Sequence, residues 1–250
     1  GITGETGQIL PSMSDKWKQV NRFIEVFDHA INSSGLVAKS GIEVVDFGCG
    51  KGYLTFAMYD YLQNELGLEA RITGVELRKN LIDFCSKAAG DLDFSGLSFE
   101  QGELAGCNVR LTDVLVALHA CDTATDLAIY TGIRAGASVI MCAPCCHKQV
   151  RPQMTIPDVL KPVMRFGSHL GQEAEMVTDS LRALLLETQG YSVGVFEFIS
   201  LEHTDKNKMI MAARMPEVLK ARREKAWAQF AAIKDFYGIR EHELERLLKL

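Results

Sequence analysis

Apolar positions along the chain follow two spacings in turn, and this alternation predicts strands followed by helices. Residues 42–47 form a short apolar run that ends in glycines, as a buried strand does. Apolar residues over 54–62 recur at intervals of three and four, as on one helix face. Further strands are expected at 71–77, 97–100, 114–120, 138–143, 191–200 and 208–215. We therefore predict an α/β fold with a seven-stranded, mostly parallel sheet, one antiparallel strand and helices on both faces.

Helical patterns also flank this alternating region. A helix is expected to start at a capping box over 12–15 and to bury one face. That face is formed by Trp17, Val20, Ile24, Phe27 and Ile31. Residues 147–171 hold three of the six prolines, which indicates an insert. The predicted organisation is a lead segment and helix (1–40), a domain (41–215) containing that insert, and a C-terminal helical extension (216–250).

Composition narrows the class of protein without naming a function. The chain has 250 residues, 47% hydrophobic and 24% charged, with a net charge of −5, which is ordinary for a globular domain and excludes a disordered chain or a collagen. We expect no membrane span, since no apolar run approaches about 18 residues. Seven cysteines, mostly within apolar segments, favour a reducing cytoplasm over a disulfide framework. Nothing in the sequence indicates an obligate protein partner.

The chemistry begins where the first strand ends, in the sequence Asp-Phe-Gly-Cys-Gly-Lys-Gly over 46–52. Glycines at a strand–helix junction let the backbone approach a ligand, and the helix N-terminus offers free amides. A dinucleotide loop requires glycine at the position of Tyr53, and a P-loop requires serine or threonine where Gly52 follows Lys51. The remaining pattern, D-x-G-x-G-x-G, is used for S-adenosylmethionine (SAM). A glycine-rich turn without a ligand is the alternative.

An acidic residue at the end of the second strand supports the SAM interpretation. Glu76 follows Asp46 by thirty positions, which leaves room for one helix and one strand. At this place an acid can accept hydrogen bonds from both ribose hydroxyls of a nucleotide. The combination indicates the cofactor and leaves the methyl acceptor open.

This assembly resembles the class I SAM-dependent methyltransferases, which implies a Rossmann-like fold over residues 41–215. The blocks at 118–127 and 144–148 resemble a narrower methyltransferase-domain group. That group includes methyltransferase-like protein 25 relatives and tRNA acceptor-stem 2′-O-methyltransferases. Asp122 stands where the group has glycine, and Lys148 where it has a second histidine.

The resemblance completes the predicted cofactor site. It implies that residues after strand two and in the loop after strand three hold the adenosine, and that S-adenosylhomocysteine is the product. It also implies that the first helix folds over the cofactor, with Lys16 and Gln19 near its carboxylate. The predicted cofactor residues are Asp46, Gly48, Cys49, Gly50, Gly52, Tyr53, Glu76, Leu77, Gly102, Glu103, His119 and Ala120.

Cysteines and histidines cluster after strands four and five, where parallel strands bring their carboxyl ends together. Four interpretations compete: a zinc site at the C-x-x-C of Cys142 and Cys145, a redox pair at the same residues, a Cys145 nucleophile, and lining of the acceptor pocket. We favour pocket lining, with His147 as general base and Cys145 and Cys146 beside it. We expect no metal, because Cys142 lies in an apolar strand and acts as a buried hydrophobe.

The acceptor is expected to be structured RNA, on the strength of the two motif blocks and of nearby basic residues. Those residues are Lys148, Arg151, Lys161 and Arg165. A cluster of basic residues of this size is more often a solvated face. The other interpretations are a protein or small-molecule methyltransferase, a non-catalytic SAM-binding module, and a zinc or redox protein.

Overall fold

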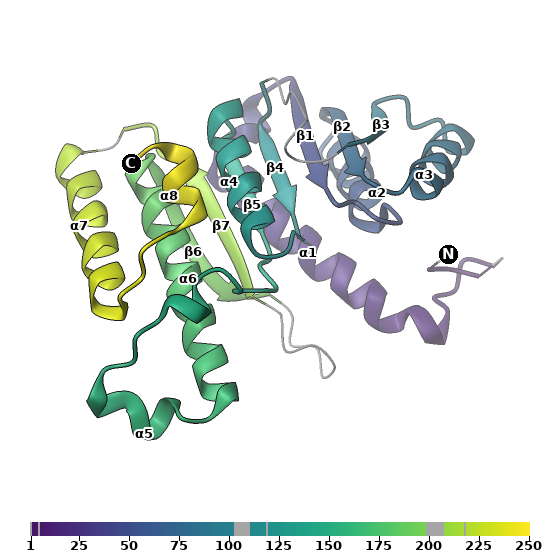
Figure 1. Ribbon diagram of the computed structural model, residues 1–250. Helices are drawn as coiled ribbons and strands as arrows, with labels where there is room; N and C mark the ends of the chain where they lie inside the picture. The colour runs from purple at the N-terminus through teal and green to yellow at the C-terminus, as the bar shows by residue number, and fades with distance from the viewer. Residues whose placement is uncertain (1, 5, 103–110, 119, 199–207, 218) are drawn as a thin grey trace.

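The structure is a computed structural model that describes residues 2–4, 6–102, 111–118, 120–198, 208–217 and 219–250. Its centre is one seven-stranded sheet with the order β3-β2-β1-β4-β5-β7-β6 (Figure 1). The strands are β1 (Gly41–Phe47), β2 (Glu69–Glu76), β3 (Leu97–Gln101), β4 (Val114–Ala117), β5 (Val139–Cys142), β6 (Tyr191–Glu197) and β7 (Lys208–Arg214). Among these strands β7 alone runs opposite to the others, antiparallel to both β5 and β6. The predicted sheet is confirmed.

Helices cover both faces of the sheet, as predicted. The first face carries α1 (Ser14–Ser33), α2 (Tyr53–Asp60) and α3 (Lys79–Asp91). The second carries α4 (Thr123–Ala135), α6 (Gly167–Thr188), α7 (Lys220–Tyr237) and α8 (Glu243–Leu248). No helix in the described part of the chain is long and apolar enough to cross a membrane.

The sheet has a hydrophobic core on each face, and alternate side chains of the central strands point into one core or the other. Val114 and Val116 of β4 face the core under α1 and α2, whereas Leu115 and Ala117 face the core under α4 and α6. Both faces of β4 and β5 are buried throughout, which explains why these strands read as continuous apolar runs.

The start of α1 differs from the prediction. Residues Pro11–Met13 form a 3-10 turn that continues directly into the helix, and no side chain caps its N-terminus. The predicted capping box is therefore wrong, because Pro11 already fixes the helical backbone before Ser14. The buried face is rotated as well: Phe23 and Ala30 are fully buried, whereas Trp17 is 40% exposed.

The insert after β5 is shorter than predicted. It contains the short helix α5 (Lys161–Met164), and α6 begins already at Gly167 rather than after residue 171. The start of α6 was not predicted because glycine, present at positions 167 and 171, is typical of loops rather than of helices. Both lie beneath the guanidinium of Arg151, which donates a hydrogen bond of 3.0 Å to the Gly167 carbonyl.

The parallel strands bring three loops to one edge of the sheet. These are the glycine loop after β1, the loop after β4 and the loop after β5. Strand β4 ends at Ala117, three residues earlier than predicted, so the motif block that follows it forms a loop and the first turns of α4. Ligands of such sheets bind at this edge, outside the carboxyl ends of the strands.

Candidate functional site

The glycine loop turns sharply between β1 and α2. Gly48, Gly50 and Gly52 all have positive φ, at 73°, 59° and 72°. A Cβ atom at Gly52 would also lie only 3.0 Å from the Phe56 ring. The loop therefore requires glycine for both its backbone conformation and its packing. The amide of Gly48 donates to the carbonyl of Val75 at 2.8 Å, which fastens the loop to β2.

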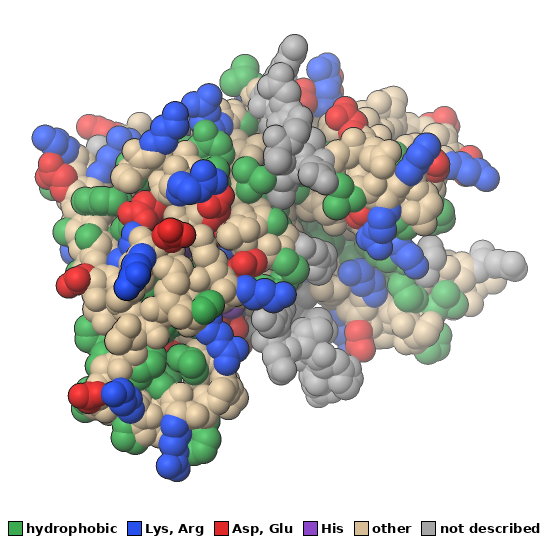
Figure 2. All heavy atoms as spheres, viewed as in Figure 1, with side chains coloured by type: hydrophobic (Ala, Val, Ile, Leu, Met, Phe, Trp, Pro, Cys, Tyr) green, Lys and Arg blue, Asp and Glu red, His purple; other side chains and the backbone are tan. Residues whose placement is uncertain are grey.

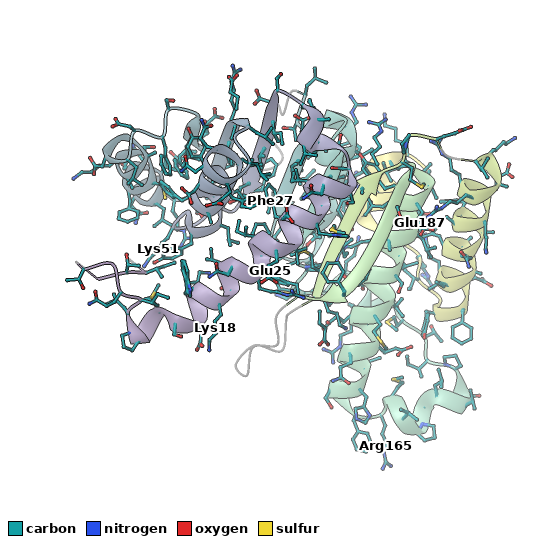
Figure 3. The ribbon with its side chains drawn as sticks, turned by 180° about the vertical axis from the view of Figure 1, so that it is seen from behind. Lys18, Glu25, Phe27, Lys51, Arg165 and Glu187 are labelled. Carbon is teal, nitrogen blue, oxygen red and sulfur yellow. The ribbon has the colours of Figure 1, made fainter. Side chains whose placement is uncertain are left out.

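A pocket of about 290 Å³ opens over this loop. It is lined by Lys16, Asp46, Gly48, Cys49, Gly50, Lys51, Tyr53, Leu54, Arg78 and Leu118. Helix α1 closes one side of it, with the Lys16 ammonium 5.5 Å from the centre of the Tyr53 ring. Seen from behind, Lys51 of the loop lies near the N-terminal half of α1 (Figure 3). The pocket thus has the glycine loop along one side, an aromatic wall and cations at its rim.

Asp46 forms the buried floor of the pocket. Its side chain accepts a hydrogen bond of 2.7 Å from the Thr55 hydroxyl of α2. Burial raises the pKa of Asp46 to about 7, although the hydrogen bond from Thr55 opposes this rise. The carboxyl group is therefore poised to change charge near neutral pH, next to the glycine loop.

Glu76 reaches back from the end of β2 to the same loop. It accepts hydrogen bonds from the Gly50 amide at 3.2 Å and from Arg78 Nε at 2.9 Å. The hydrogen bonds from Arg78 lower the pKa of Glu76 and keep it ionised, more than burial raises it. Because Arg78 is mostly exposed, it can move aside and leave the carboxylate to a ligand hydroxyl.

The remaining predicted cofactor residues follow β2, β3 and β4, and none of them lines the pocket as described. Leu77 is 57% exposed and lies outside the pocket lining, whereas the Gly102 amide donates to the Glu76 carbonyl at 3.2 Å. Ala120 lies in the loop after β4, half-buried and outside the lining. Glu103 and His119 lie outside the described residues.

Four residues that line the pocket were not predicted from the sequence as cofactor residues: Lys51, Leu54, Arg78 and Leu118. Arg78 follows Glu76, the acid expected to contact the ribose, by two positions. A basic residue so close to that acid could have been predicted to lie at the site. Leu118 is an apolar residue at a strand end and carried no signal that separates it from the core.

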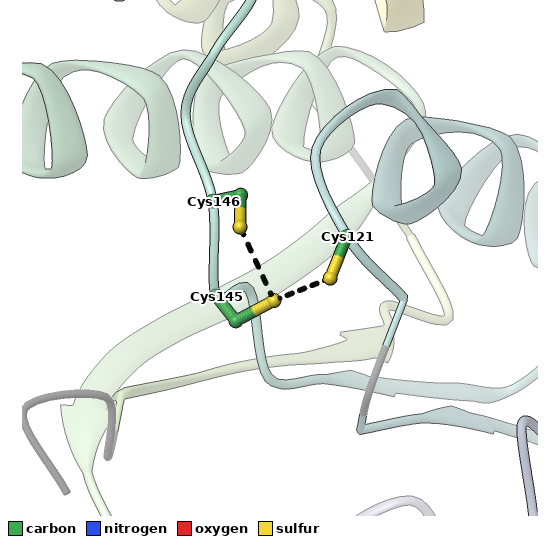
Figure 4. Close-up of side chains that lie close together, drawn as sticks. All are labelled: Cys121, Cys145 and Cys146. Atoms are coloured by element: carbon green, nitrogen blue, oxygen red, sulfur yellow. Dashed lines mark hydrogen bonds between the residues drawn. The ribbon is translucent and has the colours of Figure 1, made fainter.

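Three thiols meet at the neighbouring edge, after β4 and β5 (Figure 4). Cys121 Sγ lies 2.8 Å from Cys145 Sγ, which lies 3.7 Å from Cys146 Sγ. Burial and the two adjacent thiols raise the pKa of Cys145 to about 12. Cys142 does not join them, because it is fully buried in β5 and faces the core under α4 and α6. Of the C-x-x-C pair considered from the sequence, only Cys145 belongs to the group of three thiols.

His147 points away from the thiols that precede it. Its ring lies with Glu175 and Asp179 of α6, and its Nδ1 is 4.0 Å from an Asp179 carboxylate oxygen. The imidazole is buried, with only 8% of its residue surface exposed. The structure thus brings Cys145 and Cys146 together with Cys121, and places His147 beside an acidic partner instead.

A fully buried guanidinium joins these loops. Arg182 of α6 donates to both carboxylate oxygens of Asp126, at 3.0 and 2.8 Å, and to the carbonyl of Asp122 at 2.9 Å. It also contacts Asp179 at 3.3 Å. One side chain thereby connects α6, the start of α4 and the surroundings of His147.

Asp122 explains one departure from the motif. Its φ of 54° and ψ of −123° belong to a region that glycine adopts readily and other residues avoid. Its side chain accepts a hydrogen bond of 3.1 Å from the Gln149 amide in the next loop. Asp122 therefore has a strained backbone conformation, but it makes a hydrogen bond between the two loops that glycine cannot make.

Comparison with known proteins agrees with this geometry. A model of a methyltransferase-domain family matches residues 15–153. The human protein called glutathione S-transferase C-terminal domain-containing protein is 24% identical over 220 residues, covering 78% of this chain and 32% of that protein. Its mouse counterpart is 25% identical over 198 residues, covering 70% and 30%. The chain spans about a third of the length of these curated relatives.

Solved structures share the fold. Magnesium protoporphyrin IX methyltransferase from Synechocystis PCC 6803, with bound S-adenosylhomocysteine, has a TM-score of 0.51 and 14% identity, covering 86% of this chain and 91% of that chain. The same enzyme with bound SAM has a TM-score of 0.50 and 12% identity, covering 83% and 86%. At these identities the likeness concerns the fold alone.

Replacing Asp46 tests the cost of its buried charge. As pH rises from about 4 to 7 the unfolded chain releases its Asp46 proton first, so the wild type loses stability over this range. Asp46→Asn removes that loss. We expect the variant to gain about 2 to 3 kcal/mol relative to wild type between about pH 5 and about pH 8, measured by urea unfolding. Parallel pH profiles for the two proteins would contradict the assignment.

Replacing Asp122 separates strain from hydrogen bonding. Asp122→Gly loses the acceptor for Gln149 but relieves the backbone, whereas Asp122→Ala loses the acceptor and keeps the strain. We expect the glycine variant to be more stable than the alanine variant by about 1 to 2 kcal/mol in chemical denaturation. Asp122→Asn retains an oxygen acceptor and is the control. An alanine variant at least as stable as the glycine variant would show that the backbone is unstrained.

Proposed function

Because the chain belongs to the methyltransferase-domain family whose model spans residues 15–153, we propose that it transfers a methyl group from SAM to an acceptor at the carboxyl ends of β4 and β5. The observation that carries this proposal is the pocket over the glycine loop, flanked by Asp46 and by Glu76. SAM supplies a methyl carbon activated by its sulfonium, so the protein mainly has to align donor and acceptor.

The residues of the pocket fit this cofactor. Gly48 and Gly50 carry no side chain where we expect the amino-acid moiety, and the Glu76 carboxylate is a hydrogen-bond acceptor suited to ribose hydroxyls. Lys16 and Lys51 at the rim suit a carboxylate. The Tyr53 ring and Leu54 offer apolar surface to the remainder of the ligand.

The acceptor side is built from the loops after β4 and β5. His147 is our candidate for the group that removes the acceptor proton, because Asp179 beside it can orient the ring and stabilise its charged form. Cys145 and Cys146 border the same edge and shape the entrance.

A cytoplasmic location remains a prediction from the cysteine pattern.

We propose structured RNA as the acceptor, following the resemblance to tRNA 2′-O-methyltransferases. Four exposed basic residues lie on or near the insert: Lys148, Arg151, Lys161 and Arg165. The guanidinium of Arg165 stacks over the Phe166 ring at 4.6 Å, and Phe166 is 47% exposed, so a flat surface is available to an unpaired base. On the face shown in Figure 2, basic and acidic side chains are interspersed.

Cofactor binding tests the first part of the proposal. We expect SAM to bind and to raise the melting temperature of the wild type. Glu76→Ala should weaken binding by about 1.5 to 3 kcal/mol, because a charged hydrogen-bond acceptor is lost. Glu76→Gln keeps an oxygen for the Gly50 amide and isolates the effect of charge. Glu69→Ala, at the exposed start of the same strand, is the control. A wild type with neither calorimetric heat nor a thermal shift would refute the cofactor assignment.

Salt dependence tests the RNA acceptor. Lys148→Gln combined with Lys161→Gln should flatten the slope of log affinity against log salt by about 0.7 to 0.9 for each phosphate that the variant no longer neutralises. Arg151 is retained because it holds the Gly167 carbonyl. The control is Lys220→Gln with Arg223→Gln on α7. Methylation of total protein but not of total RNA by the wild type would exclude RNA.

A further inference from the structure

The thiols of Cys121, Cys145 and Cys146 form one compact group. They come from two loops, one after β4 and one after β5, and all three sulfurs lie within 4.8 Å of one another. Figure 4 shows the side chains converging on a common point. Cys121 is exposed and the other two are half-buried, unlike the structural cysteines Cys85 and Cys142, which are buried. The group therefore lies where an ion can reach it from solvent.

The spacing of the sulfurs suits a tetrahedral thiolate site. With zinc–sulfur bonds of about 2.3 Å, the sulfurs of such a site lie about 3.8 Å apart. The 3.7 Å between Cys145 and Cys146 already matches this edge. Cys121 is 2.8 Å from Cys145, and a small rotation of its exposed side chain would lengthen that contact.

The loops that carry the thiols are held before any ion binds. The Asp122 side chain accepts the Gln149 amide across the gap between the loops, directly next to Cys121. Arg182 holds the Asp122 carbonyl from below, and the Thr125 hydroxyl donates to the Ala120 carbonyl at 2.7 Å. Ligands fixed in this way lose little conformational freedom on binding, which favours affinity.

We propose that Cys121, Cys145 and Cys146 bind one zinc ion, with the fourth coordination position open toward the acceptor edge. Binding replaces three S–H bonds by three sulfur–zinc bonds and releases three protons to solvent, as three thiols become three thiolates. Three protein ligands and one open position are typical of zinc sites that hold an exchangeable molecule. The sequence-based expectation of no metal considered Cys142 with Cys145; this site uses a different set.

The second cluster of metal-ligand residue types in the described part of the chain does not compete for the ion. It contains His147, Glu175 and Asp179. Glu175 pairs with Lys208 at 3.0 Å, and Asp179 pairs with Arg182 at 3.3 Å. These carboxylates have cationic partners and are hard ligands, whereas thiolates are the ligands that suit a soft cation.

Zinc titration of anaerobically reduced protein tests the proposal. We expect one zinc per chain, and with cobalt as a probe we expect thiolate-to-cobalt charge-transfer absorption. Cys121→Ser and Cys146→Ser should each weaken zinc binding by at least about 100-fold, because even partners outside the first coordination sphere are worth 10- to 100-fold. Cys85→Ala removes a cysteine elsewhere and should leave both the zinc affinity and the stoichiometry unchanged.

Two results would overturn the proposal. One is reduced wild type that binds no zinc, including the case in which mass spectrometry of the air-exposed protein shows a Cys121–Cys145 disulfide instead. The other is zinc that is retained by both serine variants. A SAM titration of the same preparations keeps this test separate from the proposed methyl transfer, because the cofactor pocket lies over the glycine loop and not on the thiols.

Discussion

The buried guanidinium of Arg182 is the interaction on which the acceptor side of the molecule depends. It is 1% exposed, so its desolvation must be offset by strong partners, and the bidentate contact with Asp126 provides them. Because its remaining contacts reach the Asp122 carbonyl and Asp179, α6 is fixed against the loop after β4 and against the surroundings of His147. A guanidinium this deeply buried cannot move without losing these contacts, so it holds the loops that it contacts in a fixed position.

The two halves of the site are built by different means. The cofactor half is made largely from backbone: glycines with positive φ, loop amides that donate to Val75 and to Glu76, and two acids at strand ends. The acceptor half is made from side chains that a hydrogen-bonded and charged frame holds in place, namely the three thiols and His147. A backbone cradle suits a cofactor that is common to many enzymes, whereas a side-chain frame can be altered to take another acceptor.

The sequence predicted the sheet and the cofactor loop because both depend on local patterns. The mostly parallel sheet followed from the alternation of strands and helices, and the loop followed from glycines at positions of positive φ, which other residues rarely adopt. The acceptor half was predicted less well, because its contacts join residues far apart in the chain. The opposite directions of Cys146 and His147, and the link from Arg182 to Asp126 across 56 positions, leave no mark in local spacing. The start of α6 was not predicted because its first turns contain two glycines, which are typical of loops.

The proposed methyl transfer requires that the glycine loop and Glu76 hold SAM with its reactive end toward the loops after β4 and β5. A crystal structure of the complex with S-adenosylhomocysteine would show this arrangement directly. We expect the ligand to lie over residues 48–53, its ribose hydroxyls to contact Glu76 after Arg78 has moved aside, and its sulfur to face the edge formed by Cys121 and Cys145. A ligand bound elsewhere, or with its sulfur directed away from that edge, would refute the proposed arrangement of donor and acceptor.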